Sequence, residues 1–179
     1  MIRAALPTDA AQIASIYNPF IRNSIVTFEE SEVTADDMAQ RIKHIQSAGL
    51  PYLVSEEGTH IEGYAYASIW KSRAAYKHTV EISVYIDPAS QGKGLGQRLY
   101  TALFETLLPQ NYHAVIGVIT LPNEASIRLH EHFGMKKVAH FTEVGRKFGR
   151  WIDVGYWQGF LDDAQKIAKG SGAKDGYPN

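Results

Sequence analysis

Residues 79–96 read TVEISVYIDPASQGKGLG, and they contain the pattern from which the fold is inferred. Apolar side chains at 80, 82, 84 and 86 alternate with mostly polar ones, which is the period of a β-strand buried on one face. Glycines at 92, 94 and 96 follow, and a helical apolar pattern runs from there to about Leu108. Glycines between a strand and a helix bring backbone N–H groups close to the positive end of the helix. The stretch therefore predicts an anion site suited to a pyrophosphate.

The glycine loop does not match the two common nucleotide fingerprints. The dinucleotide motif requires a glycine at position 97, where the chain has Gln97. The Walker motif requires Gly-Lys-Ser or Gly-Lys-Thr, which is absent from the loop. On the loop alone, two interpretations stay open: a cradle for another pyrophosphate ligand, or a glycine-rich turn that only joins a strand to a helix.

Length and composition restrict the class of protein. The 179 residues suit one domain, and 18 basic against 19 acidic residues exclude the basic footprint of a nucleic-acid-binding protein or a polybasic membrane patch. The absence of cysteine excludes disulfides, thiolate metal ligands and a cysteine acyl-enzyme. The first residues do not resemble a signal peptide, and no apolar run approaches the roughly 20 residues that span a bilayer. We therefore expect a cytoplasmic protein without a metal, a membrane or a nucleic acid as partner.

The hydrophobic pattern predicts an α/β fold. Helices are expected after Thr8-Asp9, from about Thr34, from the glycine loop to about Leu108, and over 123–133. Strands are expected over about 52–56, 61–70, 79–87, 114–120, 137–144 and 150–160. This order predicts a mixed sheet with helices on both faces. Residues 1–161 are expected to form the domain and 162–179 a mobile tail.

Three further stretches, taken with the loop, carry a resemblance to a known group. They are WKSRAAY at 70–76, NEASIRLHEHFGM at 123–135 and WIDVGYW at 151–157. From about Ile2 to Leu161 the chain resembles the GNAT superfamily of N-acetyltransferases. Within it, the chain is similar to the phosphinothricin acetyltransferase branch, which includes amino-acid N-acyltransferases acting on methionine sulfoximine and sulfone. The resemblance implies a mixed, mostly antiparallel sheet of about seven strands flanked by about four helices.

The resemblance also implies that acetyl-CoA is the co-substrate. The backbone of 92–96 would hold its diphosphate, the strand around Val84 would pair with the pantetheine arm, and Asn123 would reach the same arm. Lys93 is open to two interpretations, a charge near the phosphates or a solvated lysine. The residues implied to bind acetyl-CoA are Val84, Tyr85, Ile86, Gln91, Gly92, Lys93, Gly94, Leu95, Gly96, Asn123 and Ser126.

Amide formation from a thioester needs a neutral amine, a stabilised oxyanion and a proton for the departing thiolate. Glu81 is the candidate base. It lies on the polar side of its predicted strand, and the resemblance implies that this glutamate is the base, as proposed for the branch. A Glu with the usual pKa of about 4.3 is a poor base unless burial raises the pKa or a water relays the proton. A backbone N–H near Tyr85 is the candidate oxyanion donor.

His130 is the second candidate for catalysis. The branch carries histidine where most of the superfamily carries tyrosine as candidate acid, and an imidazole could protonate the thiolate. The alternative is a histidine that is packed and hydrogen-bonded in the core. Both interpretations stay open.

The acceptor is expected to meet a basic loop. Arg73, with Lys71 and Tyr76 close by, suits a carboxylate or phosphinate because the guanidinium can bind it with two hydrogen bonds. Phe28 resembles the branch's apolar substrate wall, although it could be core. One position departs from the branch, which often has histidine where this chain has Ile152.

Together these features predict acetylation of the α-amine of a small amino-acid-like acceptor by direct transfer in a ternary complex. The alternatives are another amine (a polyamine, an aminoglycoside or a protein N-terminus) and a non-catalytic acyl-CoA-binding module. The branch commonly forms homodimers, so a homodimer is expected.

Overall fold

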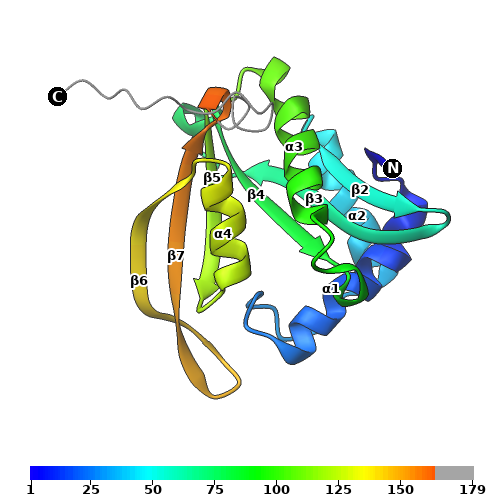
Figure 1. The fold of residues 1–179 in the computed structure, drawn as a ribbon, viewed down its shortest axis with the longest axis horizontal. Coiled ribbons are helices and arrows are strands. Elements are labelled where there is room, and N and C mark those ends of the chain that lie inside the picture. The colour runs from blue at the N-terminus through cyan, green and yellow to red at the C-terminus, as the bar shows by residue number, and fades with distance from the viewer. Residues whose placement is uncertain (164–179) are drawn as a thin grey trace.

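The computed structural model describes residues 1–163. Within them, seven strands form one sheet in the order β1-β2-β3-β4-β5-β7-β6, accompanied by the helices α1 to α4, and residues 161–163 after β7 are helical as well (Figure 1). The predicted α/β class and mixed sheet are confirmed. The predicted tail falls, apart from residues 162 and 163, outside the described residues. The elements are β1 Ile2–Ala4, α1 Ala10–Asn23, α2 Ala35–Ser47, β2 Tyr52–Glu57, β3 His60–Ile69, β4 Thr79–Ile86, α3 Leu95–Leu107, β5 Ala114–Leu121, α4 Glu124–His132, β6 Lys136–Lys147 and β7 Arg150–Phe160.

The sheet opens between its two central strands. All neighbouring strands pair antiparallel except β4 and β5, which run parallel. Their pairing covers only Thr79 to Glu81, opposite Ala114 to Ile116. Beyond Glu81 the two strands diverge, as Figure 1 shows. From Ile82 onward, β4 therefore pairs with β3 on one side and faces a gap on the other.

Two apolar clusters cover opposite faces of the sheet. One joins α3 to the side of the sheet that carries Val80, Ile82, Val115 and Ile119. The other joins α1 and α2 to the outer strands through residues such as Tyr64. This arrangement confirms the predicted helices on both faces.

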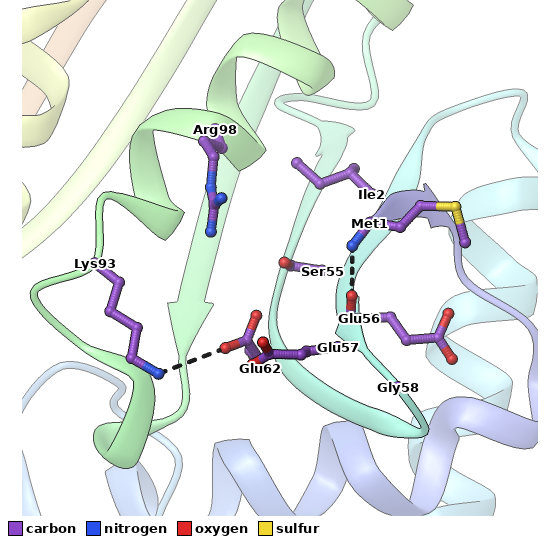
Figure 2. Close-up of a pocket in the computed structure, with 9 residues that line it drawn as sticks. All are labelled: Met1, Ile2, Ser55, Glu56, Glu57, Gly58, Glu62, Lys93 and Arg98. Carbon is purple, nitrogen blue, oxygen red and sulfur yellow. Dashed lines mark hydrogen bonds and ion pairs between the residues drawn. The ribbon is translucent and has the colours of Figure 1, made fainter.

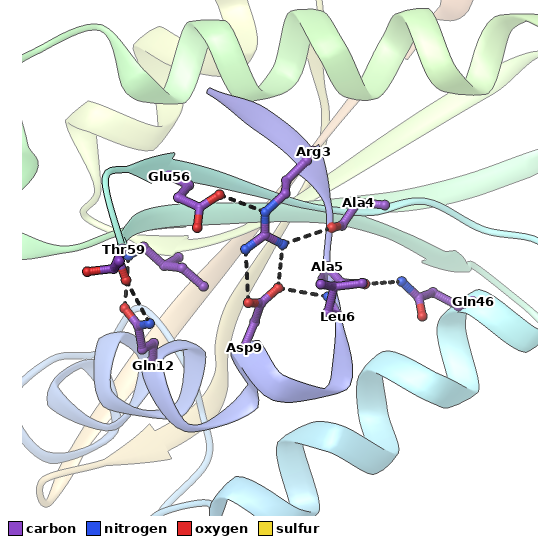
Figure 3. Close-up of polar contacts among 10 residues, drawn as sticks. Arg3, Ala4, Ala5, Leu6, Asp9, Gln12, Gln46, Glu56 and Thr59 are labelled. Atoms are coloured by element: carbon purple, nitrogen blue, oxygen red, sulfur yellow. Dashed lines mark hydrogen bonds and ion pairs between the residues drawn. The ribbon is translucent and has the colours of Figure 1, made fainter.

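The first strand was not located by the sequence pattern, because β1 has only three residues. It is held by polar contacts: the Met1 ammonium donates to the Glu56 backbone carbonyl (Figure 2). Arg3 contacts both oxygens of Asp9 at 2.7 and 3.0 Å and one oxygen of Glu56 at 2.7 Å (Figure 3). These bonds hold the pKa of Asp9 below its usual range, with Arg3 as the main cause.

The last two strands form a long hairpin that ends the sheet. Its register shifts between Phe141 and Gly145, and Glu143 within this bulge has φ of 51°. The hairpin leaves large apolar side chains exposed, with Trp151 at 60%. Ile152, where the branch often has histidine, is buried in β7. No helix within residues 1–163 is both long and apolar enough to cross a membrane.

Candidate active site

A groove of about 950 Å³ runs along the opened edge of β4 toward the start of α3. It lies between this edge and α4, and its floor includes the glycine loop. Ten of the eleven residues predicted to bind acetyl-CoA line it: Val84, Tyr85, Ile86, Gln91, Gly92, Gly94, Leu95, Gly96, Asn123 and Ser126.

The N-terminus of α3 presents unpaired donors to this groove. The side chains of Thr34 and Asn123 cap α2 and α4, whereas the residue that precedes α3 is Gly94, which has no side chain to cap it. Gly94 adopts φ of 72° and Gly92 φ of 77°, conformations that favour glycine. The first backbone N–H groups of a helix lack partners within it and carry partial positive charge. The groove therefore ends at an anion site.

Lys93 is not among the residues that line the groove. Its position does not decide between a charge near the phosphates and a solvated lysine. Its ammonium lies 3.8 Å from a carboxylate oxygen of Glu62, in a hollow on another side of the loop (Figure 2). Glu62 is 7% exposed and also lies 3.4 Å from the Ser90 hydroxyl. Figure 2 shows Arg98 entering the same hollow from α3. Lys93 thus forms a long ion pair with Glu62, and more than half of its side chain stays exposed to solvent.

Glu81 sits where β4 and β5 separate. It is half-buried and pairs in register with Ser68 of β3 and Ile116 of β5. Burial raises the pKa of its carboxyl above the usual value, and the nearby charge of Lys71 opposes this effect in part. A carboxyl with a raised pKa is a better base near neutral pH than an ordinary glutamate.

His130 is buried on α4, with 3% exposure, and both ring nitrogens have partners. Nδ1 lies 2.7 Å from the backbone carbonyl of Ser126, which can only accept, so Nδ1 carries the proton. Nε2 then accepts from the Tyr100 hydroxyl at 3.1 Å. Burial lowers the pKa of His130, which favours this neutral form. In this form the ring is packed and hydrogen-bonded, as in the second interpretation of the sequence.

The ring of His130 fits because β5 has a glycine opposite it. A Cβ at Gly117 would stand 2.3 Å from Cδ2 and 2.4 Å from Nε2 of His130. Real carbon atoms do not approach so closely, so any side chain at 117 would displace the ring.

A smaller cavity of about 50 Å³ lies between β4 and β5 and shares Val84, Tyr85, Asn123 and Ser126 with the groove. Side chains from both faces line it. His130 and Tyr100 come from the face that α3 and α4 cover, and Ser83 lies on the face that carries Glu81. The backbone of 82–85 forms one wall. An amine on one face and a thioester on the other could meet here.

The predicted acceptor residues are solvent-exposed. Lys71, Arg73 and Tyr76 lie in the loop between β3 and β4, whose end leads directly to Glu81. Lys71 and Tyr76 contact the Trp70 ring at 5.3 and 5.1 Å from its centre. Phe28, 39% exposed, packs on the hairpin bulge, where a Cβ at Gly145 would stand 2.2 Å from its ring. Phe28 therefore lies at the surface rather than in the core, and its role as an apolar wall for the acceptor stays a prediction.

Comparisons with known proteins agree with this geometry. Residues 2–155 match the family of acetyltransferase (GNAT) domains. The chain belongs to the GNAT family. This GNAT chain is 38% identical to an L-amino acid N-acyltransferase of Escherichia coli over 90% of its own length and 94% of the relative. It is 39% identical to a phosphinothricin N-acetyltransferase of Streptomyces viridochromogenes over 88% of its length and 85% of the relative.

Solved structures of acetyltransferases also resemble this GNAT chain. A Salmonella typhimurium acetyltransferase determined with acetyl-CoA superposes with a TM-score of 0.87 at 38% identity, covering 90% of this chain and 94% of that one. A phosphinothricin acetyltransferase of Sinorhizobium meliloti in complex with acetyl-CoA gives 0.86 at 34% identity, covering 90% and 88%. The chain is thus an N-acetyltransferase by family, and both the predicted fold and the predicted family are confirmed.

Three residues at the centre of this GNAT domain were not predicted from the sequence: Tyr100, Gly117 and Thr120. Tyr100 lies within the apolar face of α3 and is fully buried. The sequence did contain one signal for it: Tyr100 carries a hydroxyl within an otherwise apolar stripe, and a buried tyrosine hydroxyl usually needs a hydrogen-bond partner. Gly117 and Thr120 give no such signal without the strand order.

Proposed function

We propose that this protein transfers the acetyl group of acetyl-CoA to the α-amine of a small amino-acid-like acceptor. The observation that carries the proposal is the position of Glu81, half-buried at the fork of β4 and β5, with the anion groove at the other end of the same strand. The diphosphate would lie at Gly92 to Gly96, and the pantetheine arm would follow the unpaired edge of β4 toward the fork.

Direct transfer in a ternary complex suits this chain, since it has no cysteine to carry the acetyl group. Glu81, directly or through a water, takes a proton from the acceptor nitrogen as that nitrogen bonds to the thioester carbon. A backbone N–H near Tyr85 on the open edge of β4 stabilises the oxyanion, and the carbon–sulfur bond then breaks. We keep His130 as the proposed proton donor to the thiolate, a role that requires its Nε2 first to take up a proton from solvent, so that Nε2 no longer accepts from Tyr100, and then to give this proton to the sulfur.

The acceptor class follows from the basic loop beside Glu81. Lys71 is close enough to lower the pKa of Glu81, and Arg73 follows in the same exposed loop. A cation near the base, with a second one in the same loop, favours an acceptor with a carboxylate or phosphinate and disfavours a polyamine or aminoglycoside. The names of the relatives, L-amino acid N-acyltransferase and phosphinothricin N-acetyltransferase, fit this class.

The test is CoA release from acetyl-CoA with methionine sulfoximine, methionine sulfone, phosphinothricin, methionine, spermidine and an aminoglycoside. We expect turnover with the α-amino acids. Arg73→Ala should raise KM for these acceptors about 10- to 100-fold through loss of charge-assisted hydrogen bonds. Lys77→Ala, in the same loop, is the control and should change KM little. Turnover of spermidine alone would contradict the acceptor class, and acetyl-CoA binding without any turnover would favour the acyl-CoA-binding module.

We also propose a homodimer. The β6–β7 hairpin and the segment beside it expose several large apolar side chains. Phe28 and Phe141 lie on the face that carries Ile152 and Val154, and Trp151 lies on the opposite face; Val144 and Phe148 are exposed near the hairpin end. An exposed apolar group of this size is typical of a protein–protein interface. A second copy bound over this surface would also cover the acceptor side of the site near Phe28. The molar mass in solution tests the assembly: the mass of two chains would support the homodimer, and the mass of one chain would contradict it. The cytoplasmic location stays a prediction.

A further inference from the structure

One buried hydroxyl in the part of the chain that the structure describes has no partner. Thr120, on β5, is 7% exposed. Its Oγ1 is the one fully buried side-chain polar atom among residues 1–163 that makes no hydrogen bond. Such atoms are rare in folded proteins, because a buried hydroxyl gives up its bonds to water.

The hydroxyl belongs to the small cavity between the diverging strands. Thr120 lines this cavity together with Ser83, His130 and Tyr100. Because Glu81 pairs with Ile116 and side chains alternate along β5, Thr120 shares the face of Ile116 and therefore of Glu81. The hydroxyl is thus on the face where the acceptor amine is proposed to bind, in a cavity that shares lining residues with the groove.

The chemistry of the transfer supplies the missing partner. A threonine hydroxyl can donate one hydrogen bond, and the strongest acceptor that the reaction brings to this place is the thioester carbonyl oxygen. That oxygen gains negative charge when the acceptor nitrogen bonds to the carbonyl carbon, and it loses the charge when the carbon–sulfur bond breaks. A donor placed there in advance needs no reorganisation during the reaction.

We propose that Thr120 is a catalytic residue whose hydroxyl donates a hydrogen bond to the carbonyl oxygen of the acetyl group as negative charge develops on it. This inference rests on the proposed function, and it adds a side-chain donor to the backbone donor near Tyr85. The unpaired hydroxyl of the free protein is then a prepared contact that substrate completes.

The test compares Thr120→Val, which keeps the shape and removes the hydroxyl, with Thr120→Ser, which keeps the hydroxyl. Valine should lower kcat about 100-fold, as expected for loss of one oxyanion donor, with the KM for acetyl-CoA changed little. Serine should retain kcat within a few-fold. The Tm of Thr120→Val should equal or exceed that of the parent, because the change removes an unsatisfied polar group.

Thr106→Val on the surface of α3 is the control, since its hydroxyl is bonded to the Ala102 carbonyl away from the cavity. If valine at 120 fails to fold, Thr120→Ala provides the same comparison. The slow hydrolysis of acetyl-CoA without an amine gives a second readout, because water attacks the same carbonyl. An inactive amine panel with intact hydrolysis would therefore count against the acceptor class alone. Parental kcat and hydrolysis in Thr120→Val, or a lower Tm that accounts for the lost rate, would overturn the role of Thr120.

Discussion

Glu81→Gln is expected to lower kcat by about 100- to 10,000-fold, the range for loss of a general base, because the amide cannot take the proton of the acceptor amine. KM for acetyl-CoA should change little, since the groove lies further along β4. Steady-state CoA release measures both constants. Glu105→Gln, on the exposed side of α3, is the control and should leave both constants unchanged.

The same substitution should not destabilise the fold. The pKa of Glu81 is raised in the folded protein, so the folded state is penalised once the pH exceeds the unfolded value of about 4.3. Glutamine removes this penalty, and the Tm at pH 7 should equal or exceed that of the parent. A parental kcat in Glu81→Gln, or a loss of rate that follows a loss of Tm, would contradict the assignment.

Gly94→Asp should raise KM for acetyl-CoA at least about 50-fold, equivalent to about 2.4 kcal/mol. An aspartate at the start of α3 would place negative charge at the anion site and take up backbone N–H groups that the diphosphate needs. A Cβ at Gly94 meets nothing within 4 Å, so the change does not clash with the fold. Titration with acetyl-CoA or steady-state kinetics measures the effect.

Gly49→Asp is the matched control for this experiment. Gly49 has φ of 77° against 72° for Gly94, and a Cβ there also has open space, but it follows α2 and lies outside the groove. Both variants therefore carry the same backbone strain and the same added charge. Equal weakening of acetyl-CoA binding in both would contradict a diphosphate site at the start of α3.

Ten of the eleven residues predicted to bind acetyl-CoA line one groove, and eight of these ten are local in the sequence, with Asn123 and Ser126 at the start of α4. One strand, one glycine loop and one helix start lie within 79–96, and the period of each element is readable without knowing its neighbours. Lys93 was the exception in this stretch. Its side chain turns to Glu62, which is distant in the sequence and close only through the pairing of β3 with β4.

The centre of the site was harder to predict, because it depends on strand order. Gly117 faces His130, and Thr120 faces the gap, only because β5 lies beside β4 and separates from it after Glu81. No pattern within β5 marks where that separation begins. The short β1 was not predicted, because three residues are too few to show the alternating pattern of a strand. Its position depends on contacts that are distant in the sequence, such as the bonds of Arg3 to Asp9 and Glu56.

Glu81 is proposed as the base of the transfer, and the pH dependence of kcat at saturating substrates tests this role. Because burial raises the pKa of Glu81, kcat should fall on the acid side at a pH above the usual glutamate value of about 4.3. The residual kcat of Glu81→Gln should lack this acid limb. An acid limb that persists unchanged in Glu81→Gln would contradict the role of Glu81 as base, since another group would then take the proton from the acceptor amine.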